Sequence, residues 1–174
     1  MPFDREKFKA LVHYIAWKAG KRDWFGATKL NKVLWFVDAR LYVLTGTSAT
    51  GETYIREKFG PVPKHIMPVR SELEAEGKIR VNRQDNLVRI VATQPPNTNL
   101  FSEQELQVVN WWIDHIDGNH TAQSISDETH DYAWDIAKMG EELPLYAVLA
   151  NRIREPDPKE QEQLTRRAKE LGLI

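Results

Sequence analysis

TGETYIREKFGPVPKHIMPVRSELEAEGKI, residues 50–79, is the stretch that decides the predicted fold. Bulky and charged residues alternate over residues 53–59, which predicts a strand, and Gly60-Pro61-Val62-Pro63 is expected to end it sharply. Apolar residues at helical spacing then predict a helix that stops at Gly77. Two further strands, 79–83 and 87–92, follow as a hairpin. Because strand, helix, strand, turn, strand is the winged-helix order, we expect a small antiparallel sheet beside a helix.

Amphipathic helices are predicted on both sides of this stretch. Periodic apolar residues indicate helices at about 4–19, 28–45, 102–117, 121–130, 133–138 and 144–152. Asp4 and Thr28 are the expected N-caps of the first two, and Ser102 with Glu105 forms a capping box. The predicted fold class is therefore α+β, mainly α-helical: a helical domain with a small antiparallel three-stranded sheet in winged-helix-like order.

The domain organisation follows from a change of pattern near residue 156. Residues 1–155 are expected to form one domain, since a chain of 174 residues suits a single core. Residues 156–174 have the caps of a separate helix, whose narrow apolar stripe consists of Leu164, Ala168 and Leu171. We expect this C-terminal amphipathic helix to dock on the body or to serve as a partner-specific element.

Composition excludes several classes of protein. A net charge of -1 argues against a strongly basic nucleic-acid coater. The absence of cysteine excludes disulfides, cysteine-ligated zinc and cysteine nucleophiles. No stretch reads as a signal peptide or a membrane span, so a cytoplasmic location without membrane attachment is expected. The six tryptophans are expected mainly in the core, with some available for a protein-binding surface.

No local pattern of a known catalytic site occurs in the sequence. Phosphate-binding loops, the nucleophile elbow and the His-Glu-x-x-His zinc pattern are all missing. The densest group of candidate metal ligands comprises Asp114, His115, Asp117, His120, Asp127, His130, Asp131 and Asp135. Their spacing matches no metal framework, and most fall where caps and turns are expected. We therefore predict a non-enzymatic protein without a metal or cofactor.

The winged-helix order leaves a DNA-binding transcriptional regulator as the alternative function. Basic residues gather in the hairpin, where they could lie along a phosphate backbone: Lys78, Arg80, Arg83 and Arg89. The preceding helix, however, has three carboxylates that would oppose phosphate binding: Glu72, Glu74 and Glu76. A nucleic-acid partner is therefore the less favoured interpretation.

Several motifs together resemble a known family. Residues 29–38 read KLNKVLWFVD, and Thr50-Gly51 and Tyr54 precede Gly60-Pro61-Val62-Pro63. Further along the chain, Thr129-His130 precedes Trp134. In this order and spacing the motifs resemble the Panacea domain, the SocA-like antitoxin family of bacteria and phages, from about Phe8 to about Leu149.

The resemblance implies the antitoxin of a toxin–antitoxin system. Such a protein neutralises a cognate toxin, encoded by an adjacent gene, by direct protein–protein binding. Panacea domains pair with many unrelated toxins, so the resemblance leaves the toxin open, and it leaves sequestration and delivery to a protease as alternatives. The matched positions are the family-motif residues and candidates for toxin contact: Lys29, Lys32, Asp38, Tyr54, Gly60, Pro61, Thr129, His130 and Trp134. Maintenance of the fold is an equally weighted role for each of them.

Overall fold

The structure is a computed structural model that describes residues 2–84, 87–130, 132–152, 162–163, 165–167 and 169. It confirms an α+β fold that is mainly helical, with small antiparallel sheets. The helices are α1 (Arg5–Ala19), α2 (Ala27–Thr45), α3 (Ile66–Ala75), α4 (Glu103–Asn119), α5 (Ala122–Glu128), α6 (Tyr132–Ile136) and the 3-10 helix η1 (Leu145–Arg152). The strands are β1 (Tyr54–Glu57), β2 (Gly60–Pro63), β3 (Ile79–Gln84), β4 (Leu87–Ala92) and β5 (Glu142–Leu143). In the described part of the chain, no helix is both long and apolar enough to cross a membrane.

Side-chain caps fix where several helices begin. Asp4 accepts a hydrogen bond from the amide of Lys7, and Ser102 and Glu105 form the expected capping box of α4. The expected N-cap at Thr28 is wrong, because α2 begins one residue earlier and Gly26 occupies the cap position without a side-chain bond. Gly46 ends α2 in the left-handed conformation, which glycine adopts without steric cost.

The sheets use different strands from those that the winged-helix order suggested. Gly60–Pro63 does not merely end the first strand, but forms β2, which pairs with β1 across the tight turn at residues 58–59. β5 adds to the other edge of β1 and completes a three-stranded sheet in the order β2-β1-β5. β3 and β4 form a separate two-stranded sheet. A small three-stranded antiparallel sheet is therefore present, but it consists of β1, β2 and β5, whereas β3 and β4 pair only with each other.

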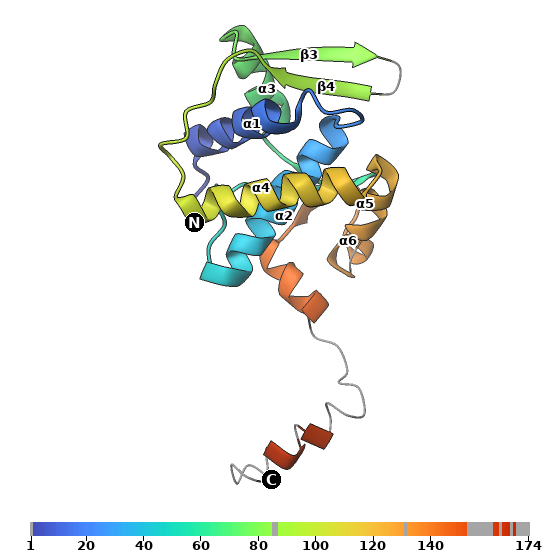
Figure 1. The fold of residues 1–174 in the computed structure, drawn as a ribbon. Coiled ribbons are helices and arrows are strands. Elements are labelled where there is room, and N and C mark those ends of the chain that lie inside the picture. The colour runs from blue at the N-terminus through green and yellow to red at the C-terminus, as the bar shows by residue number, and fades with distance from the viewer. Residues whose placement is uncertain are drawn as a thin grey trace.

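The β3–β4 hairpin and α3 lie together at one end of the molecule, beside α1 (Figure 1). Ion pairs hold α3 against α1, where Glu72 bonds Arg5 and Glu76 bonds Lys9. Two of the carboxylates that argued against phosphate binding are thus neutralised within the fold.

α2 is the central helix of the domain. It contacts α1, α4, α5, η1, β2 and β4, so elements from both halves of the chain pack around it (Figure 1). Its apolar residues are buried as the periodicity predicts, and three polar residues that the pattern placed off the apolar stripe are buried as well: Lys29, Lys32 and Asp38. Each of these polar groups therefore needs a partner inside the protein.

The segment that was expected as a separate C-terminal helix, residues 156–174, falls mostly outside the described residues. Only Glu162, Gln163, Thr165, Arg166, Arg167 and Lys169 are described there, all of them helical. The division of the chain at residue 155 stays a prediction.

Candidate protein-binding site

Asp38 is the centre of a buried hydrogen-bond cluster. The side chain is fully buried and accepts hydrogen bonds from the Tyr54 hydroxyl at 2.8 Å, the Thr50 hydroxyl at 3.1 Å and the Ala49 amide at 2.8 Å. Burial raises the pKa of Asp38 from 3.8 to about 6, against the opposing effect of these donors. The cluster ties α2 to the loop at residues 49–50 and to β1, so the Thr-Gly-x-x-Tyr motif serves the fold.

Lys29 anchors the opposite side of α2. Its ammonium bonds Asp117 of α4 at 3.3 Å, and the Asp117 carboxylate also accepts from Arg22 at 3.3 Å. Arg22 in turn bonds Asp114 at 2.8 Å. These ion pairs join the turn after α1, the start of α2 and the end of α4.

Lys32 lies where α2, the β1–β2 hairpin and α5 meet. Its ammonium approaches the Pro61 carbonyl at 3.4 Å, and burial lowers its pKa from 10.5 to about 7. A Cβ on Gly60 would collide with both Nζ of Lys32 and Oγ1 of Thr129, so the lysine and the threonine converge on this glycine. The fold thus brings Lys32, Gly60, Pro61 and Thr129 together from three elements.

His130 and Trp134 form a stacked aromatic pair near Lys32. Their rings stack with centroids 3.6 Å apart, and the Arg56 guanidinium lies 3.9 Å from the Trp134 ring centroid. Trp134 also donates a hydrogen bond to the Glu57 carbonyl at 3.2 Å. Burial lowers the pKa of His130, and the nearby charge of Lys32 adds to this effect. The contacts of Trp134 with Arg56 and Glu57 connect α6 to β1.

The sequence-predicted residues are thus split between two buried clusters, around Asp38 and around Lys32, and the separate ion pair of Lys29. Lys29, Lys32, Asp38, Tyr54 and Thr129 are almost inaccessible to solvent. Their candidate role in toxin contact stays a prediction, and their contacts show how they hold the fold. Sequence reasoning missed Asp117 and Arg56 as their partners, because each lies far along the chain from the residue that it contacts, Lys29 and Trp134 respectively.

The described members of the His/Asp group between residues 114 and 135 do not converge on a metal-binding site, and Asp131 lies outside the described residues. Asp114 and Asp117 pair with basic residues, and Asp127 accepts from Gln123 at 2.8 Å. His115 stacks on Trp111 instead of approaching the aspartates. Among the residues that the structure describes, no three His, Asp or Glu side chains are placed to hold a metal ion.

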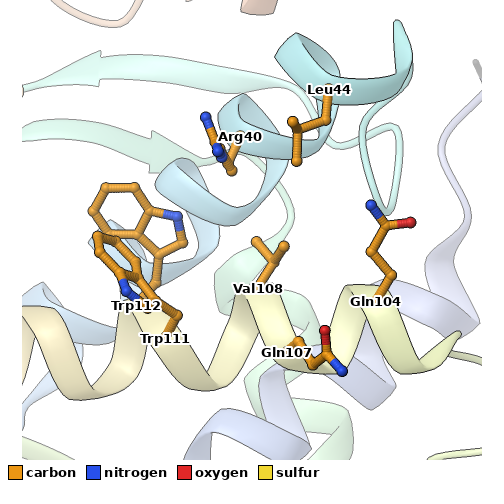
Figure 2. Close-up of a pocket in the computed structure, with 7 residues that line it drawn as sticks. All are labelled: Arg40, Leu44, Gln104, Gln107, Val108, Trp111 and Trp112. Atoms are coloured by element: carbon orange, nitrogen blue, oxygen red, sulfur yellow. The ribbon is translucent and has the colours of Figure 1, made fainter.

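A groove between α2 and α4 faces solvent and has a volume of about 560 Å³. Figure 2 shows Arg40 and Leu44 of α2 facing Val108, Trp111 and Trp112 of α4. Gln104 and Gln107 complete the lining. Trp111 is 57% exposed and Leu44 47% exposed, although both are large and apolar. We call this feature the α2–α4 groove.

A column of aromatic rings makes the floor of the α2–α4 groove rigid. Phe36 stacks on Trp112 at 4.3 Å, Trp111 meets Trp112 edge-on at 4.7 Å, and His115 stacks on Trp111 at 4.6 Å. The buried Nε1 of Trp112 has no hydrogen-bond partner in the described part of the chain. An exposed tryptophan that is already ordered loses little entropy when a partner covers it. The groove therefore has the properties of a preformed protein-binding surface.

Comparison with known proteins places the chain in a family. The model of the family "Antitoxin SocA-like, Panacea domain" matches residues 30–135, a narrower span than the predicted 8–149. This span contains the Asp38 cluster, the Lys32 cluster and the α2–α4 groove. No curated protein and no solved structure matches the chain. The match covers more than half of the sequence, and the chain therefore belongs to the SocA-like antitoxin family with a Panacea domain.

Proposed function

We propose that this protein is an antitoxin that neutralises a cognate toxin, the product of an adjacent gene, by direct protein–protein binding. Membership of the SocA-like antitoxin family is the observation that carries this proposal. A toxin partner in general follows from the family, whereas direct binding and the neighbouring gene are our inference. The function needs a binding surface and no catalytic residue.

The α2–α4 groove is the surface that best supports toxin binding. Its apolar lining, led by Trp111 and Leu44, is suited to large apolar side chains of the toxin. Arg40 is the one charged residue in that lining, and no ion pair joins it to another described residue. A toxin surface that presents an apolar ridge beside a carboxylate would therefore complement the groove.

Co-expression with the adjacent gene tests the function. The gene should arrest growth when it is expressed alone, and the wild-type protein should restore growth and co-purify with the gene product. A gene product that is harmless alone, or remains toxic beside the wild-type protein, would show that the proposed function is wrong.

Two substitutions test the groove as the contact surface. Trp111→Ala removes the exposed ring, and Leu44→Asp places a charge on the apolar lining. We expect each to weaken toxin binding by about 2 kcal/mol, roughly 30-fold, measured by calorimetry with purified proteins. Trp17→Ala is the matched control, because Trp17 is also an exposed ring but lies on α1 outside the groove.

The groove is the wrong surface if both variants bind as tightly as the Trp17 control. Removal of residues 156–174 provides a separate comparison. Loss of toxin binding by this truncated chain, with an unchanged melting temperature, would identify the C-terminal segment as the partner-specific element.

A further inference from the structure

A second cavity lies between α2 and the β1–β2 hairpin, next to the ammonium of Lys32. Its volume is about 300 Å³. From α2 it is lined by Thr28, Asn31 and Lys32, and from the hairpin by Glu57, Lys58, Phe59 and Val62. We call it the Lys32 cavity. It is distinct from the α2–α4 groove, with which it shares no lining residue.

Lys32 has no counter-charge among the described residues. The side chain is 1% exposed, and its one hydrogen bond there is the 3.4 Å contact with the Pro61 carbonyl. Glu57 lines the same cavity but forms no ion pair with Lys32 in the described structure. Burying an ammonium without an anion is costly, because the lost hydration is not replaced. The low pKa of Lys32 is a consequence of this environment.

Two more polar atoms near Lys32 lack partners. Oδ1 of Asn31 and Nε2 of His130 are buried without a hydrogen bond to a described residue. Asn31 lines the Lys32 cavity, and His130 is close enough for the charge of Lys32 to lower its pKa. Buried polar groups are nearly always paired in native proteins. A buried ammonium without a counter-charge and two unpaired polar atoms in one region indicate that something else completes the site.

The charged residues that line the Lys32 cavity leave an excess of positive charge, since Lys32 and Lys58 outnumber Glu57. Lys58 lines it beside Glu57, and Arg56 acts on His130 from β1. Asp127 and Asp135 have the opposite effect and raise the pKa of His130. No carboxylate except Glu57 lines the cavity. An anionic group would therefore gain from Lys32 and Lys58 and would be opposed by one carboxylate.

We propose that the Lys32 cavity is an oxyanion-binding site, in which the ammonium of Lys32 binds a carboxylate or phosphate group and Asn31 Oδ1 accepts a hydrogen bond from a neighbouring hydroxyl or N–H group of the ligand. A compact oxyanion restores to the ammonium the charge-assisted hydrogen bonds that it lost on burial. The exposed ring of Phe59 and the Val62 side chain offer apolar contact to the carbon skeleton that bears the anion. The source is a carboxylate of the bound toxin, a point that rests on the proposed function, or a free anion.

Titration with small oxyanions tests the site in the full-length protein. At pH 7 and constant ionic strength, sodium acetate or sodium phosphate should raise the melting temperature saturably, whereas sodium chloride should not. The Lys32 pKa, followed by NMR of its side-chain carbon next to the nitrogen, should rise when the oxyanion binds, because an anion favours the charged form. Glu57→Gln should strengthen binding, since it removes the opposing carboxylate.

Lys32→Met separates a binding role from a structural one. We expect it to abolish the response to acetate and phosphate while leaving the protein without added anion at least as stable as the wild type, because it removes an unpaired buried charge. Lys58→Met, which changes the exposed lysine of the same cavity, should weaken the response but not abolish it. No saturable response of the wild type, an equal response of Lys32→Met, or marked destabilisation by this substitution would each overturn the proposal.

Binding to the toxin distinguishes the two sources of the oxyanion. If the toxin supplies a carboxylate, Lys32→Met should weaken the complex at least tenfold and acetate should compete with the toxin. If the ligand is a free anion, Lys32→Met should bind the toxin as tightly as the wild type does. The wild type should still respond to acetate or phosphate. Failure of the wild type to neutralise the adjacent gene product would overturn the proposed function but would leave the titration with acetate and phosphate unchanged.

Discussion

Asp38→Ala should lower the free energy of unfolding by about 4 kcal/mol, measured by urea denaturation at pH 7. The substitution removes the acceptor for the Tyr54 hydroxyl, the Thr50 hydroxyl and the Ala49 amide at once. Each of these donors is then left in a site that water does not reach, and each costs about 1–3 kcal/mol when unpaired. Such a loss is a large part of the stability of a domain of this size.

Two other variants show whether the hydrogen bonds are the cause. Tyr54→Phe removes only one of the three donors and should cost about 1 kcal/mol. Asp114→Ala removes a more exposed aspartate that pairs with Arg22, and it should change stability by less than about 1 kcal/mol. An Asp38→Ala variant as stable as Asp114→Ala would contradict the role that we assign to the cluster.

Asp38 also predicts how stability depends on pH. Its pKa is about 6 in the folded protein and near 3.8 in the unfolded chain, so between about pH 4 and 6 the folded state binds a proton that the unfolded state releases. The contribution of Asp38 protonation to the free energy of unfolding is therefore fully present below about pH 4, and it is lost as the pH rises through 6. The stability of the wild type relative to Asp38→Asn should fall by up to about 3 kcal/mol across this range.

The difference in stability between the wild type and Asp38→Asn isolates the contribution of Asp38 from that of the other carboxylates. Ion pairs with basic residues lower the pKa values of Glu72 and Glu76, which gives the opposite dependence on pH in both variants. Urea denaturation at several pH values between 4 and 7 measures the difference. A constant difference across this range would show that the Asp38 carboxyl ionises alike in the folded and unfolded chains.

Gly60→Ala should cost at least about 3 kcal/mol of folding stability. Gly60 has a φ of 90°, a conformation that strains any residue with a Cβ. The new Cβ would also collide with Lys32 Nζ and with Thr129 Oγ1, and a hydrogen bond to the Ser126 carbonyl holds the Thr129 hydroxyl in place. Strain and collision therefore act together at this position, and thermal or urea unfolding measures their sum.

Gly77→Ala is the matched control for backbone strain alone. Gly77 has a φ of 66°, but a Cβ there would meet no atom within 4 Å. We expect it to cost about 1 kcal/mol. Equal losses at the two positions would mean that the convergence of Lys32 and Thr129 on Gly60 contributes nothing.

Local chemistry explains why much of the fold could be predicted. Asp4 and the Ser102–Glu105 capping box mark helix starts through hydrogen bonds between residues three apart, and such contacts are readable from sequence. Apolar spacing located α1, α2 and α4 for the same reason, since each helix carries its own buried face. The Panacea resemblance likewise rested on ordered short motifs, and the family match within residues 30–135 confirms it.

Contacts between distant parts of the chain explain what could not be predicted. Periodicity placed Lys32 and Asp38 off the apolar face of α2, and they are buried because β1, β2 and α5 cover a second face of this helix. β1 also pairs with β5, about 90 residues further along the chain, through backbone groups that carry no side-chain pattern.

By itself, the sequence determined the α+β, mainly helical fold class of this protein and its membership of the SocA-like antitoxin family. The tertiary structure alone decided that most of the motif residues are buried and that Leu44 and Trp111 line one groove. It also decided that Lys32 lies beside a cavity without a counter-charge. The physical reason is that helix caps and apolar stripes act within one element, whereas burial and cavities arise where elements distant in sequence pack together.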